Sequence, residues 1–404
     1  MKERITRNKN FMLLCTGVTA SELGGAFGTF TNSVLVYELT GSKLALGSMW
    51  LFYYVPSILF QLISGPLIDR WSRKWIMIIS QWTRGLIFLL PLIVLELGML
   101  ETWHIYFVQI VISFITPLYV PANQAIIPTI IPKAKLPAAN AFLDGMTRMM
   151  LFIAPVLGGL VIQTIGTRST LLMISTLLIS SGLLLLSLQE NRIRITIRKS
   201  WFGQLQEGIH YFFGMRLIVW LGIFLALVQF GVGVTLVINL PYITDVLGGD
   251  YQHYGYFMAG FPLGYMLGST LIGRLQGIKR RYVMLGSLVI GGFTYIALGL
   301  TTSIFLAISI EMLAGIAMAI FSIHNISICQ QTIPNELMGK VMSVRLAIIK
   351  FAMLLGILAG GTVSELWGIR PMYVTIGSII VLVSLGGITI PYFTFLDKPI
   401  SQKQ

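Results

Sequence analysis

The sequence predicts an all-α integral membrane protein with twelve transmembrane helices in two pseudo-symmetric six-helix bundles. Of its 404 residues, 55% are hydrophobic and 11% are charged, and the mean hydropathy is +0.83, so the chain is far more apolar than an ordinary water-soluble domain. The apolar residues come in blocks of roughly 20, the length that a helix needs to cross a hydrocarbon core. The chain also repeats itself at a spacing of 202 residues. Together these features indicate lipid as the solvent and a duplicated bundle as the architecture.

Apolar blocks bounded by charge, glycine or proline define the expected spans. Those of the first half are 11–37, 44–67, 75–95, 103–126, 139–164 and 169–188. Those of the second half are 217–244, 252–273, 282–301, 303–329, 341–364 and 371–395. The longest polar interruption lies between the two groups. We therefore expect an N-terminal bundle over 1–188, a cytoplasmic linker over 189–216 and a C-terminal bundle over 217–404.

The net charge of +13 is concentrated in the short connections between apolar blocks. One set of alternate connections, together with both termini, holds 21 Lys and Arg, whereas the other set holds only Lys43, Arg168 and Arg370. Cytoplasmic loops retain Lys and Arg, so both termini should be cytoplasmic and the protein should cross the plasma membrane an even number of times. No basic face typical of nucleic-acid recognition is evident. The expected surroundings are membrane lipid, without a nucleic-acid partner.

Internal repetition supports the two-bundle architecture. A shift of 202 residues places Ile131-Pro132 on Ile333-Pro334, Arg148 on Lys350, Ala154 on Gly356 and Gly158-Gly159 on Gly360-Gly361. Duplicated halves related by an axis along the membrane normal are typical of secondary transporters. A channel or a receptor remains an alternative, and saturable, gradient-driven flux would distinguish a carrier from either.

Motifs for other kinds of chemistry are missing from the sequence. The two cysteines are too few for a disulfide framework or a metal cluster. There is no G-x-x-x-x-G-K-[ST] run for nucleotide, no G-x-S-x-G elbow and no H-E-x-x-H pair. We therefore expect no enzymatic activity, no cofactor and no metal, and transport driven by an ion gradient or by the substrate gradient.

The connection after the second span carries one carboxylate among several cations, in the run Gly65-Pro-Leu-Ile-Asp-Arg-Trp-Ser-Arg-Lys74. This run resembles the G-x-L-x-D-R-x-G-R-K signature of the major facilitator superfamily, with Ser72 in place of the second glycine. In that family the loop helps to hold one conformation, and an aspartate there can face a helix N-terminus or a cation. The resemblance implies a gating loop made of Gly65, Asp69, Arg70, Arg73 and Lys74.

The fifth expected span ends in Ala154-Pro155-Val-Leu-Gly158-Gly159, which resembles the G-P-x-x-G-G motif of drug/proton antiporters in the same superfamily. Close helix packing alone would also account for the small residues Gly158 and Gly159, and Pro155 permits a bend. Together with PANQAIIPTIIPKAKLPAANAF and WFGQLQEGIHYF, this stretch is most similar to the macrolide-efflux-like exporters, a branch that also includes siderophore exporters. The similarity spans essentially the whole chain.

The resemblance implies a major facilitator fold and proton-coupled efflux of amphipathic small molecules, of the macrolide or multidrug type, by a monomeric antiporter. The sequence departs from many proton-coupled exporters in the fourth span. Those exporters carry an arginine early in this span, whereas the most polar deep residue of this chain is Gln109. Two alternatives stay open: a siderophore or metabolite exporter, and an importer or facilitator of a small metabolite.

Charged side chains within apolar blocks are functional candidates, because burying them in a bilayer is costly. Glu22 lies eleven residues into the first span, about 16 Å deep at the rise of a helix, and is the first choice for coupling or for a cationic substrate group. By the family resemblance, spans 1, 5, 10 and 11 line a central cavity, where Arg148, Glu311 and Lys350 would join it. The alternative is structural ion pairing, for example of Asp144 with Arg148.

Polar and aromatic residues add further candidates for the cavity wall. Asn32 and Tyr53 belong to an amphipathic set suited to a bulky, partly apolar ligand. His324 and Asn325 lie in a polar run of the tenth span, where they either line an aqueous pathway or bond across helices. Arg84, in the peripheral third span, is expected to be structural.

Overall fold

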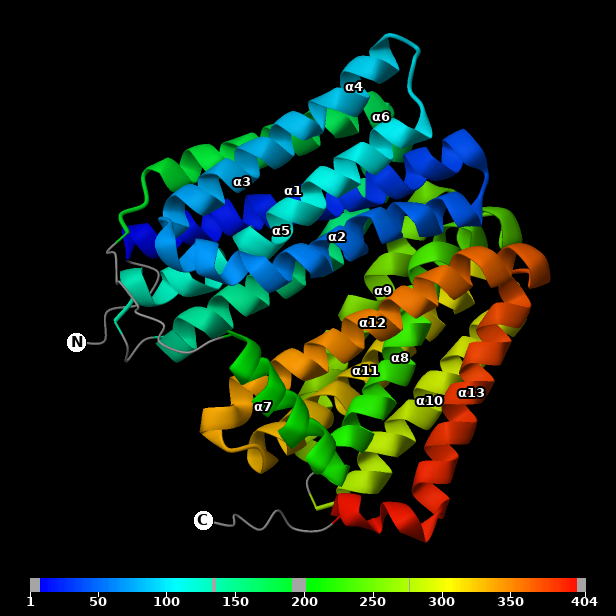
Figure 1. The fold of residues 1–404 in the computed structure, drawn as a ribbon. Helices are drawn as coiled ribbons and strands as arrows, with labels where there is room; N and C mark the ends of the chain where they lie inside the picture. Colours follow the sequence, from blue (N-terminus) through cyan, green and yellow to red (C-terminus); the bar gives the residue numbers. More distant parts are fainter. Residues whose placement is uncertain (1–7, 133–135, 191–200, 276, 398–404) are drawn as a thin grey trace. The chain divides into compact units, whose positions relative to one another are not determined.

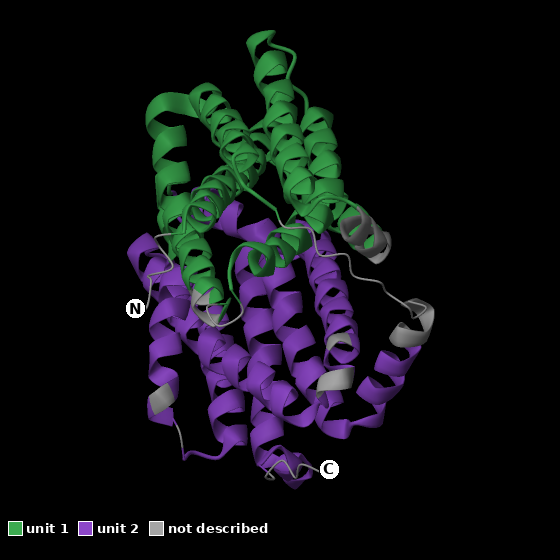
Figure 2. Ribbon diagram, turned by 90° about the vertical axis from the view of Figure 1, so that its left-hand side faces the viewer, with its two compact units in different colours: residues 1–196, 249–259 green, residues 197–248, 260–404 purple. Residues whose placement is uncertain are grey.

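The computed structural model describes residues 8–132, 136–190, 201–275 and 277–397, and every regular element in these ranges is a helix (Figure 1). The chain divides into two compact units (Figure 2). Unit 1 comprises Met1–Thr196 and Gly249–Ala259, and unit 2 comprises Ile197–Gly248 and Gly260–Gln404. The division between residues 196 and 197 falls within the expected linker, 189–216. In addition, the segment 249–259 groups with unit 1 although it lies in the second half of the sequence.

Unit 1 is built mainly from six helical elements. These are α1 Lys9–Thr40, α2 Lys43–Arg70, α3 Arg73–Ile87, α4 Leu89–Glu96, α5 Thr102–Ile130 and α6 Leu136–Leu186. The side chain of Asn8 accepts a hydrogen bond from the N–H of Phe11 and caps α1, and Gly41, at φ 60°, ends it. In α6, Gly166 has φ 79° and ψ 169°, which breaks the helix between the two spans expected there.

Unit 2 begins with a helix inside the expected linker, α7 Trp201–Gly214. The long helices that follow are α8 Arg216–Pro241, α9 Tyr251–Leu271, α10 Arg280–Leu300, α11 Ile304–Thr332, α12 Asn335–Trp367 and α13 Ile369–Thr389. Shorter helical turns are η3 Tyr242–Val246, η4 Ile272–Leu275 and η5 Pro391–Asp397. The first turns of α9 belong to unit 1 and the rest of α9 to unit 2. The segment expected as a plain linker therefore holds the helix α7.

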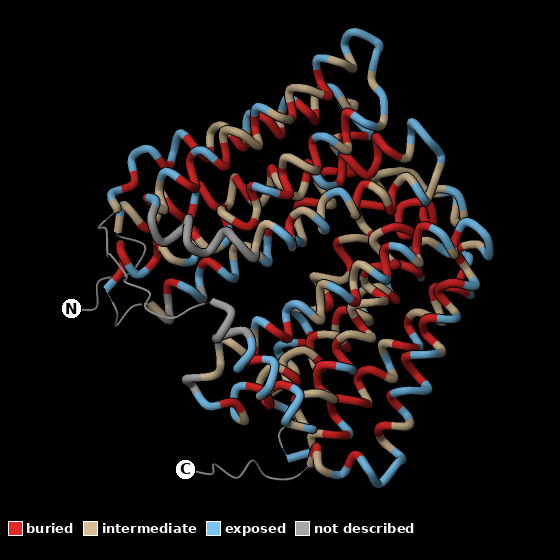
Figure 3. Tube along the Cα trace, in the orientation of Figure 1, coloured by how far each residue is buried: buried red, intermediate tan, exposed pale blue. Residues whose placement is uncertain are grey.

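Ten helical stretches in the described residues are long and apolar enough to cross a membrane. One of them, Phe142–Leu186, has 45 residues and contains the break at Gly166, so its length suffices for two spans. Large apolar side chains are exposed along the helices (Figure 3). Those more than half exposed include Leu59, Leu97, Phe305, Leu366 and Leu382. Such a surface is suited to lipid and not to water.

The repeat found in the sequence is also present in the backbone. Helices α5 and α11 each have 29 residues and begin 202 positions apart. Each ends in the same way, because the N–H of Ile131 donates to Ile127 O and that of Ile333 donates to Cys329 O. Gly166 and Gly368 are also 202 positions apart, and both have the positive φ that breaks a helix. The two units thus share this helix length and C-terminal hydrogen bond and this glycine break.

A carboxylate distant in sequence caps one helix of each unit, α3 and α10. In unit 1 the Glu190 carboxylate accepts hydrogen bonds from the Ser72 hydroxyl and from the N–H groups of Arg73 and Lys74, at the start of α3. In unit 2 the Asp397 carboxylate accepts from the N–H of Arg281 at 3.1 Å, at the start of α10. Negative charge at a helix N-terminus is stabilising. Neither cap was predicted from the sequence.

Glycines let the helices of each unit approach closely. In unit 1, Gly158 of α6 lies against Phe27 and Phe30 of α1. In unit 2, a Cβ on Gly356 of α12 would overlap the carbonyl oxygen of Phe230 of α8. Backbone-to-backbone packing of this kind is typical of membrane helices, where burial of apolar surface gives little drive for association.

Candidate functional site

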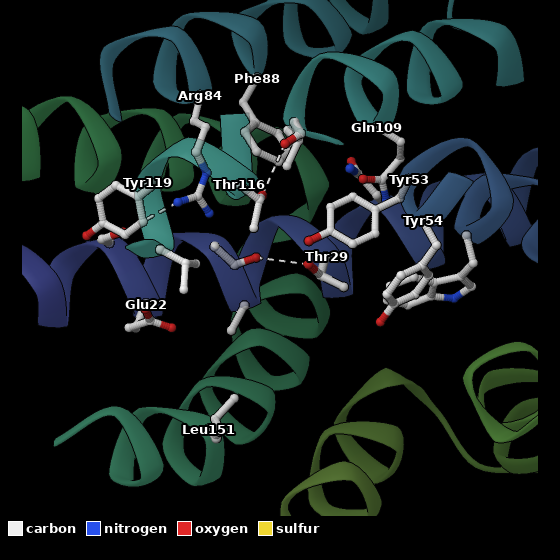
Figure 4. Close-up of a pocket in the computed structure, with 17 residues that line it drawn as sticks. Glu22, Thr29, Tyr53, Tyr54, Arg84, Phe88, Gln109, Thr116, Tyr119 and Leu151 are labelled. Carbon is white, nitrogen blue, oxygen red and sulfur yellow. Dashed lines mark hydrogen bonds between the residues drawn. The ribbon is translucent and has the colours of Figure 1, made fainter. Parts of the chain in front are cut away.

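Side chains of unit 1 line a partly open cavity of about 300 Å³ (Figure 4). Its wall is made by α1, α2, α3, α5 and α6, together with Phe88 at the junction of α3 and α4. The lining residues are Ser21, Glu22, Gly25, Ala26, Thr29, Asn32, Trp50, Tyr53, Tyr54, Arg84, Phe88, Gln109, Ile112, Thr116, Tyr119, Val120 and Leu151. Three of the residues singled out from the sequence, Glu22, Asn32 and Tyr53, are therefore brought together here.

One face of α1 supplies much of this wall. Its lining residues Glu22, Gly25, Ala26, Thr29 and Asn32 follow one another at helical spacing. Figure 4 shows Glu22 on the side of α1 where Leu151 of α6 lies. The small residues between Glu22 and Asn32 leave room for a ligand and for side chains arriving from α3.

Arg84 reaches α1 from α3 and joins a polar cluster. Its Nη1 lies 3.4 Å from both Ser21 Oγ and Gln81 Oε1, and Gln81 Nε2 donates to Ser21 Oγ at 2.5 Å. The guanidinium occupies the space that a Cβ on Gly25 would take, so a larger residue there would displace the end of the Arg84 side chain. Arg84 also interacts electrostatically with Glu22, which places one base and one acid at the same cavity.

Asn32 brings a buried amide with unmet hydrogen-bonding groups to the cavity. Its side chain is 1% exposed and lines the cavity, yet neither its Oδ1 nor its Nδ2 has a hydrogen-bond partner in the described part of the chain. An unmet buried amide is costly, and native proteins satisfy such groups with a partner, water or ligand. Asn32 can both donate a hydrogen bond to a bound molecule and accept one from it.

Aromatic rings from α2, together with Phe88, form another part of the cavity wall. Trp50 and Tyr54 stack at a centroid distance of 5.9 Å, and Tyr53 meets Tyr54 edge-on at 5.0 Å. Phe88 packs over Gly28 of α1, where any larger residue would collide with its ring. The cavity therefore combines flat apolar surfaces with charged and amide groups, which suits a molecule that has both kinds of surface.

The other charged candidates lie elsewhere. Arg148 is outside the set of lining residues and its Nε pairs with Asp144 Oδ2 at 2.8 Å, the ion pair foreseen as the alternative. Glu311 in α11 and Lys350 in α12 are half-buried and belong to unit 2, where Gly260 of α9 packs against Glu311. The cavity itself thus gathers one of the four charged residues proposed from the sequence.

His324 and Asn325 of α11 have defined partners in unit 2. His324 Nδ1 lies 2.8 Å from Ile320 O, one turn back along the helix. Asn325 is fully buried, donates to Leu221 O at 3.0 Å and accepts from Arg345 Nη2 at 2.7 Å. Asn325 therefore bonds across helices, which is one of the two roles considered for it.

The surroundings of Gly65 and the side chains of Asp69 and Arg70 lie outside what the structure describes. Their predicted gating contacts therefore stay a prediction. For Arg73 and Lys74, the backbone N–H groups bond to Glu190. Lys74 Nζ also donates to Leu186 O at 2.7 Å. The basic end of this loop is thus tied to the end of α6.

The Pro155 motif lies at a tight helix contact within unit 1. A Cβ on Gly159 would meet the backbone of Tyr251 and Gly255 in the first turns of α9, and a Cβ on Gly255 would meet Pro155 O. The glycines permit this approach because they have no side chain.

Several lining residues were not recognisable from the sequence. Arg84 was expected to be structural because its span is peripheral in the family, but Gly25 and Gly28 lie opposite α3 and let that helix approach. Thr116 and Tyr119 carried no distinct signal, since hydroxyl and aromatic residues are common throughout the spans, whereas Tyr54 belonged to the amphipathic set expected with Tyr53.

The helical units, the apolar exterior and the cavity of mixed polar and apolar lining are consistent with a multi-pass membrane transporter, and the family match gives the class as the major facilitator type. Residues 5–395 match the family described as transmembrane secretion effector, MFS_3, and the chain belongs to that family.

Relatives match along nearly the whole chain. The uncharacterised MFS-type transporter YfmI of Bacillus subtilis is 25% identical, covering 94% of this chain and 96% of its own. Macrolide efflux protein A of Streptococcus pyogenes is 21% identical over 90% and 93% of the two chains. The enterobactin exporter EntS of Escherichia coli O1:K1 / APEC is 24% identical over 76% and 70%.

Solved structures share the fold. A crystal structure of a mutant of the nucleoside transporter NupG superposes with a TM-score of 0.79 at 15% identity, covering 97% of this chain and 100% of that one. A bacterial homologue of the iron transporter ferroportin in the inward-facing state gives 0.76 at 17% identity over 98% and 100%. At such identities the likeness concerns the fold alone.

Proposed function

We propose that this protein is a secondary active exporter that moves amphipathic small molecules out of the cell in exchange for protons. It would cross the plasma membrane twelve times, with both termini in the cytoplasm, as a monomer without enzymatic activity. Its two halves would alternate between inward-open and outward-open states around a central site. Efflux proteins among its relatives support the direction of transport.

The observation that carries the proposal is the mixed lining of the cavity in unit 1. Glu22, Arg84 and the unpartnered amide of Asn32 offer charge and hydrogen bonds, while Trp50 and Tyr54 offer flat apolar surface. Its volume of about 300 Å³ lies at the lower end of the usual range for ligand pockets. It fits a compact amphipath or one part of a larger molecule.

Glu22 is the proposed coupling residue. Protonation removes its negative charge and with it the attraction to Arg84, so the cavity differs electrostatically between the two states. A cationic or hydrogen-bonding substrate would bind better to one of these states than to the other. Proton entry and substrate exit are then linked through a single carboxylate.

The test is flux in proteoliposomes loaded with a panel of macrolides, lipophilic cations, siderophores and nucleosides, under a pH gradient of either sign. Gradient-driven export of one class, lost in Glu22→Gln, is the expected result. Gradient-driven uptake instead would establish an importer. Flux that ignores the gradient in the wild type would rule out proton coupling and leave a facilitator or another coupling ion.

A further inference from the structure

Arg345 of α12 is a buried cation with open hydrogen-bond donors. The residue is 6% exposed, and its Nη2 donates to Asn325 Oδ1 at 2.7 Å. Its Nε and Nη1 are buried and have no partner in the part of the chain that the structure describes. A buried charge without a counter-charge is strongly unfavourable, and so is a buried donor without an acceptor.

Three helices of unit 2 fix the orientation of this guanidinium. Asn325 of α11 accepts from Arg345 and is itself held by its bond to Leu221 O of α8. Cys329, one turn further along α11, interacts with the guanidinium electrostatically. Arg345 is thus presented in one position by groups that are neutral or weakly acidic.

The nearest ion pair along α12 is made by Lys340, five residues before Arg345. Glu207 of α7 pairs with Lys340 of α12 at 2.5 Å, about one turn before Arg345. Among the ion pairs of the described residues, none involves Arg345. The counter-charge that burial demands is therefore not supplied by the described side chains.

Unit 1 shows that the fold does not require a cation here. The shift of 202 residues places Leu143 on Arg345 and Asn123 on Asn325. Leu143 is also 6% exposed and belongs to a hydrophobic cluster. The same stretch of helix is therefore built in unit 1 with an apolar side chain, and the charge in unit 2 needs another explanation.

We propose that Arg345 binds a monovalent anion, a halide or a carboxylate, at the N–H groups that its bond to Asn325 leaves open. A guanidinium presents its N–H groups as a planar fork that matches a carboxylate and also accommodates a spherical anion. The anion comes either from the solution or from a molecule that carries a carboxylate. This binding site does not depend on the proposed direction or coupling of transport.

The test uses the full-length protein in lipid nanodiscs, with its thermal unfolding midpoint followed as sodium methanesulfonate, which is neither a halide nor a carboxylate, is replaced by sodium bromide or sodium benzoate. Constant ionic strength removes general screening from the comparison. Specific binding raises the midpoint in a saturable way, by about 1–2 °C at ten times the Kd for a chain of this size. Wild type is expected to show this shift.

Four variants locate the response. Arg345→Leu introduces the residue of unit 1 and should abolish the shift, whereas Arg345→Lys keeps the charge without the fork and should weaken it. Asn325→Asp places a built-in carboxylate beside Arg345 and should abolish the shift while keeping the arginine. The matched control is Arg168→Leu, which removes an exposed arginine that pairs with Glu96 and should respond like wild type.

Each outcome decides the matter. A bromide response that Arg345→Leu or Asn325→Asp removes, with bromide located beside Arg345 by anomalous diffraction, supports a site for free anions. A response to benzoate alone supports a site for carboxylate-bearing molecules. Equal midpoints of the wild type in all three salts overturn the proposal, and so does a response that survives in Arg345→Leu and in Asn325→Asp.

Discussion

The two units differ in where each carries a glutamate within its helices: the position of the glutamate in one unit is that of a glutamine in the other. Glu22 of α1 and Gln229 of α8 are 207 positions apart, the same spacing that separates the helix-ending glycines Gly41 and Gly248. Gln109 of α5 and Glu311 of α11 are 202 positions apart, the spacing of their two helices. Each unit therefore has one glutamate and one glutamine at this pair of sites, in opposite order.

This exchange shows how a duplicated fold becomes asymmetric. Glutamate and glutamine have nearly the same shape, so helix packing does not distinguish them, whereas only the carboxylate can carry a proton. In unit 1 the carboxylate lies with Arg84 at the cavity, while in unit 2 it lies beside Tyr295 and Tyr242, which it influences electrostatically. We infer that the backbone repeat sets the positions and that single substitutions divide the roles.

The largest expected effect tests that division of roles. Glu22→Gln gives both units a glutamine in the first helix, and we expect gradient-driven export to fall by about tenfold or more, since the proposed coupling charge is lost. Flux in proteoliposomes measures it, with Glu96→Gln as the control because Glu96 pairs with the exposed Arg168. Unchanged flux and pH dependence in Glu22→Gln would break the comparison.

The next effect concerns packing. Gly356→Ala introduces into unit 2 the residue that unit 1 has at Ala154, but the new Cβ collides with Phe230 O. We expect a loss of about 1–3 kcal/mol, typical of overpacking. The reverse change, Ala154→Gly, should cost only about 1 kcal/mol as a helix-interior glycine. Thermal unfolding in detergent compares the two, and equal losses would show that the contacts are alike.

A smaller effect is expected for the carboxylates that cap α3 and α10. Glu190→Ala removes an acceptor for three donors and should destabilise by about 1–2 kcal/mol. Asp397→Ala should have a similar effect, because it removes a backbone cap and an ion pair with Arg281 at 3.3 Å. Measured unfolding midpoints should fall in both. A neutral Glu190→Ala would show that Ser72 caps α3 by itself.

The smallest effect depends on pH. Burial acts to raise the pKa of Asp250, but hydrogen bonds from His253 and its charge outweigh this and lower that pKa. A lowered folded-state pKa gives stability above the ordinary value of 3.8 that is lost as the pH falls through the folded-state pKa. Because 41% of the Asp250 side chain is exposed and solvent screens its charge, we expect only a few tenths of a kcal/mol. Asp250→Ser, which imitates the Ser42 cap of α2, should remove this acid dependence of the unfolding midpoint.

The sequence predicted the helical class and the places where helices break, because composition and block length report directly on the solvent. It placed the break between 164 and 169, and the structure has it at Gly166. It missed α7, since the apolar face of WFGQLQEGIHYF is too short to read as a span. Length and composition support ten membrane-spanning stretches in the described residues, so the count of twelve spans stays a prediction.

For the site, the sequence identified Glu22, Asn32 and Tyr53 from depth and polarity alone. It did not identify Arg84 as a lining residue, because depth within a span does not say which face of the helix a side chain occupies. Nor did it single out Arg345, although that residue lies within the expected span 341–364. Its burial and its partner Asn325 emerge only from tertiary structure.

The division of α9 has a mechanical consequence. The helix is continuous from Tyr251 to Leu271, yet Gly249–Ala259 belongs to unit 1 and the residues from Gly260 onward belong to unit 2. If the units rock, α9 must either bend or slide along its packing contact with Pro155 and Gly159. Pro262 has no backbone N–H and therefore removes one helical hydrogen bond within three residues of the division, where α9 bends most easily. If the two halves rock as proposed, α9 would act as a flexible joint, and its stiffness would set how easily they turn.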